Sequence, residues 1–277
     1  MFRAPGICTR RAENGHLFGR QRRLVTKAKA APEMKSMGGE LSIAVFGASG
    51  GLGQSFVTAF AKNEAVRTVH AFSRNREKNV PPAVSPHPFD LLDEGSIEHA
   101  AELVSRSGPL HLVIVATGLL QDGDTTPEKR AHDLSPSAME RLFRINAIGP
   151  ALIAKHFLPL LDRKRKSVFA ALSARVGSIE DNHLGGWHSY RASKAALNMF
   201  VKNHAIELAY RNTNAVCVAL HPGTVATSLS EPFQRNVPIE KLFTPEHAVA
   251  QMLTVIDSLA PADSGGLFAW DGQRIPY

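Results

Sequence analysis

Tyr190 and Lys194 are the residues of this sequence whose types and spacing suggest chemistry. They are four positions apart, so on a helix they share one face, one turn from each other. A Tyr phenol titrates near pH ~10, and an ammonium one turn away favours the phenolate and lowers that pKa. Such a phenol can give a proton to a carbonyl oxygen or take one from an alcohol. The pattern is short, so its meaning depends on the elements around it.

A glycine-rich turn joins a predicted strand to a predicted helix near residue 50. Residues 41–46 are apolar and rich in strand-forming types, and residues 54–62 show helical spacing. Between them, Gly47, Gly51 and Gly53 allow a tight turn and let the backbone approach a pyrophosphate at a helix N-terminus. The context favours a dinucleotide site over a plain turn.

The next predicted strand, 68–72, ends in Ser73 and Arg74. An acidic residue at this place would bind a ribose 2′-hydroxyl, whereas an arginine suits a 2′-phosphate. No acidic residue follows before Glu77. The sequence therefore favours NADP over NAD, unless Arg74 is only a solvated loop cation.

Strands and helices alternate along the rest of the chain. Residues 80–88, 121–135, 177–187 and 222–242 are predicted loops, and Asp93 is a predicted helix cap. The alternation predicts a single α/β domain of the Rossmann type, a doubly wound parallel sheet with helices on both faces. The remaining strands are expected at 110–116, 167–172, 215–220 and 267–270, and the helices at 95–105, 136–161, 189–210 and 245–259.

The net charge of +7 lies in residues 1–39, which hold nine of the 32 Lys and Arg residues and two of the 25 Asp and Glu residues. We therefore predict a basic leader over 1–39 and a charge-balanced domain over 40–277. The leader resembles a mitochondrial or plastid transit peptide. The alternatives are a disordered extension or a start at Met34 or Met37, and a chain that does not use the leader would be cytoplasmic. A nucleic-acid partner would depend on this leader alone, and we expect none.

Cysteine content and hydropathy exclude two further classes. Cys8 and Cys217 are the only cysteines, which leaves no disulfide framework or cysteine-based metal site. The longest apolar stretch of the body, 110–120, is too short to span a bilayer, so no membrane association is expected. His183, His188 and His221 show no metal-ligand spacing, and no metal is expected.

A third motif element is Asn146, in the long predicted helix. With the glycine turn and Tyr190-x-x-x-Lys194 in order around it, residues 41–277 resemble the short-chain dehydrogenase/reductase family. Several blocks are similar to its C-factor-like branch in particular. They are Arg175-Val-Gly-Ser-Ile179, Gly185-Gly-Trp187, Tyr190 to Asn198, Leu220-His-Pro-Gly-Thr224 and Asp263 to Gly272.

The resemblance implies a role for each matching position. It implies that Tyr190 is the acid/base, that Lys194 tunes it and binds the nicotinamide ribose, and that Asn146 anchors a water-mediated proton relay. Two departures stand out: Phe46 replaces a family threonine, and Val115-Ala-Thr-Gly118 replaces Asn-Asn-Ala-Gly. Together with the residues argued above, the expected cofactor-binding set is Gly47, Ser49, Gly51, Leu52, Gly53, Ser73, Arg74, Asp90, Leu91, Gly118, Tyr190, Lys194, Pro222, Gly223, Val225 and Thr227.

The family's substrate-orienting serine would fall on Ala174, three residues before Gly177. Ser173 is one place early, and on a strand a shift of one residue points the side chain to the opposite face. Three alternatives stay open: Ser173 serves as the orienting catalytic hydroxyl, Ser178 replaces it, or no serine does so.

The expected function is that of an NADP-dependent oxidoreductase that reduces a small-molecule carbonyl compound or oxidises the alcohol. The alternative is an NADP-binding, C-factor-like signalling or scaffold protein with little turnover. Family members commonly pair through the helices that carry Asn146 and Tyr190, which implies a homodimer or homotetramer. The loop 223–243 carries Leu229, Phe233, Val237 and Leu242 and is expected to act as a lid over the substrate.

Overall fold

The computed structural model describes residues 32–75, 80–123 and 126–277. They form an eight-stranded sheet in the order β10-β9-β6-β5-β4-β1-β2-β3 and a small second sheet of β7 and β8. In the large sheet every pairing is parallel except that of β10 with β9. The strands are β1 (Leu41–Phe46), β2 (Val66–Ser73), β3 (Val84–Pro88), β4 (Leu112–Val115), β5 (Ser167–Leu172), β6 (Ala215–His221), β7 (Thr224–Val225), β8 (Leu242–Phe243), β9 (Leu267–Ala269) and β10 (Arg274–Ile275).

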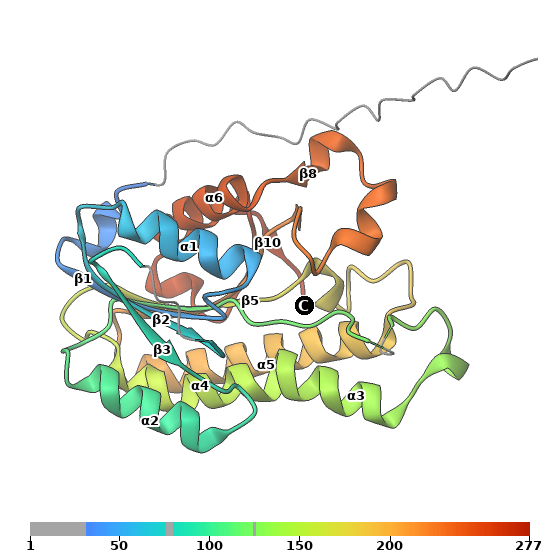
Figure 1. Cartoon of the computed structure of the whole chain (residues 1–277), viewed down its shortest axis with the longest axis horizontal. Coiled ribbons are helices and arrows are strands. Elements are labelled where there is room, and N and C mark those ends of the chain that lie inside the picture. The colour runs from blue at the N-terminus through green and yellow to red at the C-terminus, as the bar shows by residue number, and fades with distance from the viewer. Residues whose placement is uncertain (1–31, 76–79, 124–125) are drawn as a thin grey trace, which may run out of the picture.

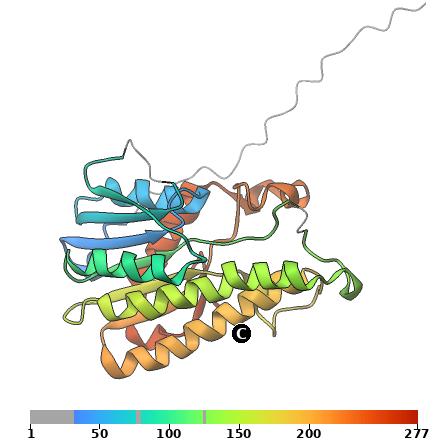
Figure 2. The same ribbon diagram turned by 60° about the horizontal axis from the view of Figure 1, so that its bottom comes forward.

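Helices cover both faces of the large sheet (Figure 1). One face carries α1 (Gly51–Ala61) and α6 (Pro245–Ser258), and the other carries α2 (Glu94–Ser105), α4 (Gly149–Phe157) and α5 (His188–Arg211). The turned view shows the same layers, with α3 (Pro136–Phe143) leading into α4 (Figure 2). A separate apolar cluster fills each side of the sheet. The predicted doubly wound α/β architecture is confirmed.

Several strands read as continuous apolar runs because they are covered on both faces. Every residue of β1 and β5 is buried, as are the apolar residues of β4 and β6. The predicted cap at Asp93 is confirmed, since its carboxylate accepts a hydrogen bond from Gly95 N at 3.0 Å at the start of α2.

The sequence interpretation was wrong at the two edges of the sheet. Residues 84–88, predicted to be loop, form β3, which carries Pro86 and Pro88. A proline cannot donate a ladder hydrogen bond, and β3 tolerates two because it is an edge strand. At the opposite edge the two-residue strand β10 is too short to give a periodic signal.

The long helix predicted over 136–161 is interrupted. α3 ends at Phe143, a π-helical segment spans Arg144–Ile148, and α4 begins at Gly149. In the π segment the backbone hydrogen bond from Gly149 N to Arg144 O spans five residues. Such wide turns often lie at functional sites, and Asn146 lies at the centre of this one.

The folded body starts before the boundary expected at residue 40. Met34 and Met37 are 0% and 1% exposed and belong to the core on the α1 and α6 side of the sheet. Lys166 Nζ donates hydrogen bonds to Ser36 Oγ and to the carbonyls of Ile256 and Asp257. The expected leader, apart from residues 32–39, lies outside the described residues. Among the described helices, none is long and apolar enough to cross a membrane.

Candidate active site

Tyr190 and Lys194 lie in the first two turns of α5, on one buried face as the spacing predicts. Their side chains are almost inaccessible, with 7% and 3% of each residue exposed. Lys194 Nζ donates a hydrogen bond to the carbonyl of Leu172, at the end of β5, over 2.9 Å. The same Nζ lies 5.9 Å from the centre of the Tyr190 ring. The pair therefore lies where β5 ends, at the carboxyl edge of the parallel sheet.

Burial, and not the Tyr–Lys pairing, sets both pKa values in this structure. Removal of water disfavours the phenolate, so the pKa of Tyr190 rises well above its ordinary value. The same loss of water disfavours the ammonium and lowers the pKa of Lys194 to about 8. The expected lowering of the Tyr190 pKa is therefore not seen, because desolvation dominates. A tyrosine phenol is protonated at neutral pH with or without this shift, and the raised pKa by itself makes Tyr190 a weaker acid.

Asn146 ties three parts of the site together. Its Oδ1 accepts from Leu119 N at 2.8 Å, and its Nδ2 donates to Leu119 O at 2.8 Å and to Ser193 Oγ at 3.1 Å. Ser193 Oγ donates in turn to the carbonyl of Tyr190. At the end of β4 the chain has Val115 and Ala116 where the resemblance implies two asparagines. The side chain of Asn146 supplies hydrogen bonds to the segment that follows. The wide π turn brings this amide to the start of α5.

The structure engages both candidate serines in internal hydrogen bonds. Ser173 is buried, and its Oγ donates a hydrogen bond at 2.7 Å to Oδ1 of Asn198, which lies on α5. Ser178 is buried and its Oγ accepts from Asp181 N at 3.0 Å. Ala174, between them, is partly buried and packs against the apolar cluster that contains Tyr190.

The segment before α5 forms a wall of the site. Gly185, Gly186 and Trp187 all have positive φ, an arrangement that is strained for tryptophan. The Trp187 ring meets the Tyr190 ring edge-on at 6.2 Å between centroids. Arg191 fixes this segment by donating hydrogen bonds to the carbonyls of Gly186 and Val176.

The predicted lid lies over the same place. Its Phe233, in a short 3-10 helix over Glu231–Asn236, packs on Trp187 with ring centroids 4.9 Å apart. Leu229 Cδ1 lies 3.9 Å from the position that a Cβ on Gly118 would take, and Lys194 Nζ lies 3.7 Å from that position. Figure 1 shows this segment, which leads to β8, at the same end of the sheet as the start of α5. Val237 and Leu242 continue the segment, and Leu242 is buried in β8.

The glycine turn forms a cradle that side chains would fill. Gly47 has φ +78°, and a Cβ on Gly53 would lie 2.0 Å from the carbonyl oxygen of Gly47. A Cβ on Gly51 would lie 2.8 Å from Thr227 Cγ2, so the turn directly faces the segment after β6. Ser49 is exposed at the turn and Leu52 is half-buried. The turn leads into α1, whose free N–H groups suit a phosphate.

The expected adenosine end lies beside the cradle. Ser73 is buried at the end of β2, where its Oγ donates to Asn75 O, and Arg74 is exposed. Among the described residues Arg74 has no ion-pair or hydrogen-bond partner. A cavity of about 320 Å³ lies here, with Ala48 and Ser73 in its lining.

The other predicted cofactor positions occupy the same edge of the sheet. Asp90 is exposed, and its Oδ1 accepts a hydrogen bond from Leu92 N at 2.9 Å. Leu91 packs closely on Gly149: its Cγ lies 2.6 Å from the position that a Cβ on this glycine would take. After β6, Gly223 has φ +78° and Val225 is buried in β7, next to the half-buried Pro222 and Thr227. These residues fit a dinucleotide that lies across the strand ends.

The family follows from a comparison of the whole chain with known proteins. The family model described as short chain dehydrogenase matches residues 42–238. This chain belongs to the short chain dehydrogenase family. It is 37% identical to the C-signal protein of Myxococcus xanthus over 145 residues, which cover 52% of this chain and 82% of that protein.

Other relatives of this short-chain dehydrogenase are oxidoreductases. It is 33% identical to 1-hydroxy-2-glutathionyl-2-methyl-3-butene dehydrogenase of Rhodococcus sp. (strain AD45) over 189 residues, 68% of this chain and 78% of that one. The NADPH-bound carbonyl reductase from chicken fatty liver has the same fold, with a TM-score of 0.74, 26% identity and coverage of 90% of this chain and 100% of that one. The chain is accordingly an NAD(P)-dependent oxidoreductase.

Sequence reasoning missed one residue of this dehydrogenase's site, Glu128. The residue is 5% exposed, and its carboxylate accepts hydrogen bonds from both Ser189 N and Ser189 Oγ in the first turn of α5. Its backbone carbonyl accepts from Trp187 N. No signal in the sequence could reveal it, because Glu128 lies 61 residues from its partner in a segment of irregular structure.

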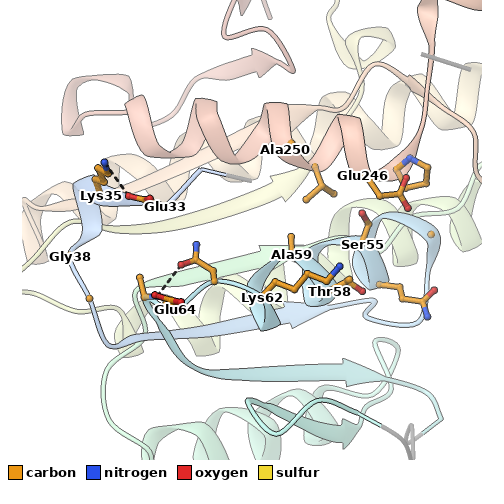
Figure 3. Close-up of a pocket in the computed structure, with 17 residues that line it drawn as sticks. Glu33, Lys35, Gly38, Ser55, Thr58, Ala59, Lys62, Glu64, Glu246 and Ala250 are labelled. Carbon is orange, nitrogen blue, oxygen red and sulfur yellow. Dashed lines mark hydrogen bonds and ion pairs between the residues drawn. The ribbon is translucent and has the colours of Figure 1, made fainter. Parts of the chain in front are cut away.

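A separate groove of about 1220 Å³ lies on the outer face, between α1 and α6 (Figure 3). It is lined by small and charged side chains such as Ser55, Ala59, Lys62, Glu64 and Glu246. Neither Tyr190 nor Lys194 lines this groove, but Gly51 of the glycine turn does, so the groove adjoins the site at the start of α1. Among the described residues, no group of three or more His, Cys, Asp or Glu side chains could hold a metal ion.

Proposed function

We propose that this short-chain dehydrogenase uses NADP(H) to reduce a small carbonyl compound, or to oxidise the corresponding alcohol, with Tyr190 as the acid/base. The observation that carries the proposal is geometric: a buried Tyr190 and a buried Lys194, whose Nζ lies 5.9 Å from the centre of the Tyr190 ring, stand at the end of β5 near the glycine-lined cradle. The chicken carbonyl reductase, with the same fold, is described with bound NADPH, which supports the choice of cofactor.

The preference for NADP depends on Ser73 and Arg74. The exposed Arg74 follows the buried end of β2 and could pair with a 2′-phosphate, and among residues 73–75, the described part of this turn, none is acidic. Gly47, Gly51 and Gly53 would let the backbone approach a pyrophosphate, and Gly118 would leave room for a ribose beside Lys194.

A bound nicotinamide supplies or accepts the hydride, and the chain handles the proton. Tyr190 gives its proton to the carbonyl oxygen as negative charge grows there. Lys194, whose Nζ lies 5.9 Å from the centre of the Tyr190 ring, would favour the phenolate that this transfer leaves. The side-chain amide of Asn146 is bonded to Leu119 and Ser193, which fixes this residue next to the start of α5 for the proposed water-mediated relay.

The test is the Tyr190→Phe variant, which removes the phenolic proton and little else. We expect carbonyl reduction to fall by ~10²-fold or more, while NADPH quenches protein fluorescence with an unchanged Kd and binds more tightly than NADH. Retained turnover in the variant contradicts the role of Tyr190. Equal affinity for NADPH and NADH contradicts the role of Arg74.

Association with a second copy is part of the same proposal. Exposed apolar side chains lie along α5, namely Met199, Phe200, Ile206 and Tyr210, and Ile148 is exposed just before α4. Burial of this face in a homodimer or homotetramer removes it from water. Light scattering tests this, and a monomer at micromolar concentration contradicts it.

Residues 1–31 are proposed to direct the protein to a mitochondrion or plastid. The support is their basic, acid-poor composition. Sequencing of the mature N-terminus in the native organism tests the idea, and a protein that keeps Met1 in the cytoplasm contradicts it.

A further inference from the structure

Trp187 lies beside Tyr190 in a backbone conformation that tryptophan rarely adopts. Its φ of 51° and ψ of 41° place it in the left-handed region, directly before α5. A bulky residue keeps this conformation only where its surroundings hold it, and residues of this kind gather at functional sites. The conformation therefore calls for a functional reason.

The backbone and the ring of Trp187 are both held in place. Trp187 N donates a hydrogen bond to the carbonyl of Glu128, and Trp187 O accepts one from Arg191 N at 2.8 Å. The ring meets the Tyr190 ring edge-on with centroids 6.2 Å apart, and it packs on Phe233 of the lid with centroids 4.9 Å apart. The fold itself thus fixes the indole against the phenol.

The indole N–H of Trp187 is not used by the fold. Among the described residues, none accepts a hydrogen bond from its Nε1. This atom does not belong to the buried polar atoms that lack a partner, so solvent reaches it. Thr117 Oγ1 does belong to them, so a substrate atom cannot reach that hydroxyl unless the chain moves. Trp187 therefore presents an accessible donor at the wall of the site.

Two of the serines near Tyr190 have given their protons to other groups. Ser173 Oγ donates to Asn198, and Ser193 Oγ donates to the backbone carbonyl of Tyr190. Ser178 is different, because its Oγ accepts a backbone N–H and its own proton has no acceptor among the described hydrogen bonds. It is 2% exposed. Ser178 is therefore the alternative donor that an experiment has to separate from Trp187.

A second donor beside the phenol has a defined chemical use. Reduction of a carbonyl places negative charge on its oxygen, and that oxygen can accept two hydrogen bonds. With hydrogen bonds of ~2.9 Å, two donors that share one oxygen lie no more than ~5.8 Å apart. The centroid separation of 6.2 Å between the rings of Trp187 and Tyr190 is compatible with this limit, because each donor group lies at the rim of its ring.

We propose that Trp187 Nε1–H is the second donor to the substrate carbonyl oxygen, in place of the serine that is absent at Ala174. The inference rests on the proposed carbonyl reduction, in which Tyr190 donates the proton. The indole donates a hydrogen bond and keeps its own proton throughout. It orients the carbonyl and stabilises the charge that grows on the oxygen, so it contributes more in the transition state than in the bound substrate.

A matched pair of variants separates the N–H from the ring. Phenylalanine and histidine are close in size, and only histidine carries a ring N–H. The probe is the ketone that the wild type reduces fastest among acetophenone, cyclohexanone and 2-octanone. We expect Trp187→Phe to lower kcat by ~10²-fold with little change in the Kd for NADPH, and Trp187→His to recover ~10-fold of this loss. Wild-type kcat in Trp187→Phe overturns the inference, and equal losses in both variants indicate a packing role and also overturn it.

A spectroscopic measurement tests the hydrogen bond directly. With ¹⁵N-labelled indoles, Trp270→Phe identifies the signal of Trp187, because the chain has two tryptophans. In the presence of oxidised NADP, which prevents reduction, the same ketone should move the Trp187 N–H signal to lower field and slow its exchange with water. The matching alkene, in which C=CH₂ replaces C=O, fills the same space without an acceptor and should do neither. Equal responses to ketone and alkene overturn the inference.

Ser178→Ala distinguishes the alternative donor. If this variant loses as much kcat as Trp187→Phe, and the ketone leaves the indole signal unchanged, then Ser178 is the donor and the inference is wrong, while the proposed function stands. If the wild type reduces none of the three ketones, the inference fails together with the proposed function.

Discussion

At the scale of single residues, the site follows from what burial does to Tyr190 and Lys194. Their spacing predicts a shared helix face, and the structure confirms it. Their pKa values could not be predicted, because the loss of water depends on β5, on the lid and on the turn before α5, which lie far away in the sequence. A short motif therefore identifies the reacting groups, whereas the tertiary structure determines their protonation.

Lys194 makes stability depend on pH. Its pKa is about 8 when folded, against ~10.4 for an unperturbed lysine, so between these values the unfolded chain binds more protons. The penalty for a buried ammonium is complete below pH 8 and is relieved as the pH rises. We expect the Tm of the wild type, measured relative to Lys194→Met, to increase from pH 7.5 to pH 10.

The same titration in Tyr190→Phe serves as the control. Burial is the cause of the Lys194 shift, so removal of the phenolic hydroxyl should preserve the trend with pH. A difference in Tm that stays flat or falls over this range contradicts the assignment.

The sequence leaves open which serine, if any, orients the substrate, because Ala174 occupies the expected position. Family resemblance identifies the missing serine, and it leaves Ser173 and Ser178 as candidates. The hydrogen bond from Ser173 Oγ to Asn198 Oδ1 depends on how the end of β5 packs on α5, which the sequence does not reveal, whereas the bond from Asp181 N to Ser178 Oγ is local to its own loop.

At the scale of elements, the orientation of α5 depends on a side chain from outside the helix. α5 begins at His188 with no side-chain cap from its own N-terminal residue, Trp187. Glu128 takes that role, because its carboxylate accepts from Ser189 N and Ser189 Oγ. A carboxylate at this end is also favoured by the helix dipole. Glu128 is thus a positioning residue for Tyr190, which follows Ser189 directly.

Glu128→Ala should destabilise the protein and reduce the rate. Loss of a helix cap costs about 0.5–2 kcal/mol, and the buried Ser189 hydroxyl then lacks its acceptor. We expect a lower Tm and a decrease in kcat larger than any change in the Kd for NADPH. Glu128→Gln keeps one acceptor oxygen and should recover part of both losses.

The exposed Glu180 provides the matched control, since Glu180→Ala removes a carboxylate of the neighbouring loop without removing a cap. If Glu128→Ala behaves like Glu180→Ala in both measurements, Glu128 has no positioning role.

Prediction of the elements was accurate where periodicity is strong and failed where tertiary context decides. The buried strands and α1, α2, α5 and α6 lie close to the expected ranges. The π segment could not be predicted, because Arg144–Ile148 has ordinary helical composition, and the hydrogen bonds of Asn146 to Leu119 and Ser193 accompany the widened turn.

At the scale of the whole molecule, the catalytic edge of the sheet and the start of the folded body lie at opposite ends. The short 3-10 turn Lys35–Met37 packs beside α6, and Arg165 donates a hydrogen bond to Gly39 O. Composition alone assigned these residues to the basic leader, because their charges match those that precede them. The burial of Met34 and Met37 and the hydrogen bonds of Ser36 and Gly39 to the body distinguish them.

Met34 and Met37 should therefore contribute to stability as core residues do. Replacement of a buried methionine by alanine costs about 2–5 kcal/mol, because it loses burial and leaves a cavity. We expect Met34→Ala and Met37→Ala each to lower the free energy of unfolding by an amount in this range in urea titrations, with an unchanged m-value. Lys35→Ala, which removes an exposed side chain between them, should have an effect of less than about 0.5 kcal/mol. Variants that begin at residue 32 and at residue 40 should differ in the same direction, because only the first retains both methionines. Equal stability of these two variants would show that residues 32–39 belong to the leader, as composition suggests, and that their burial contributes nothing to the fold.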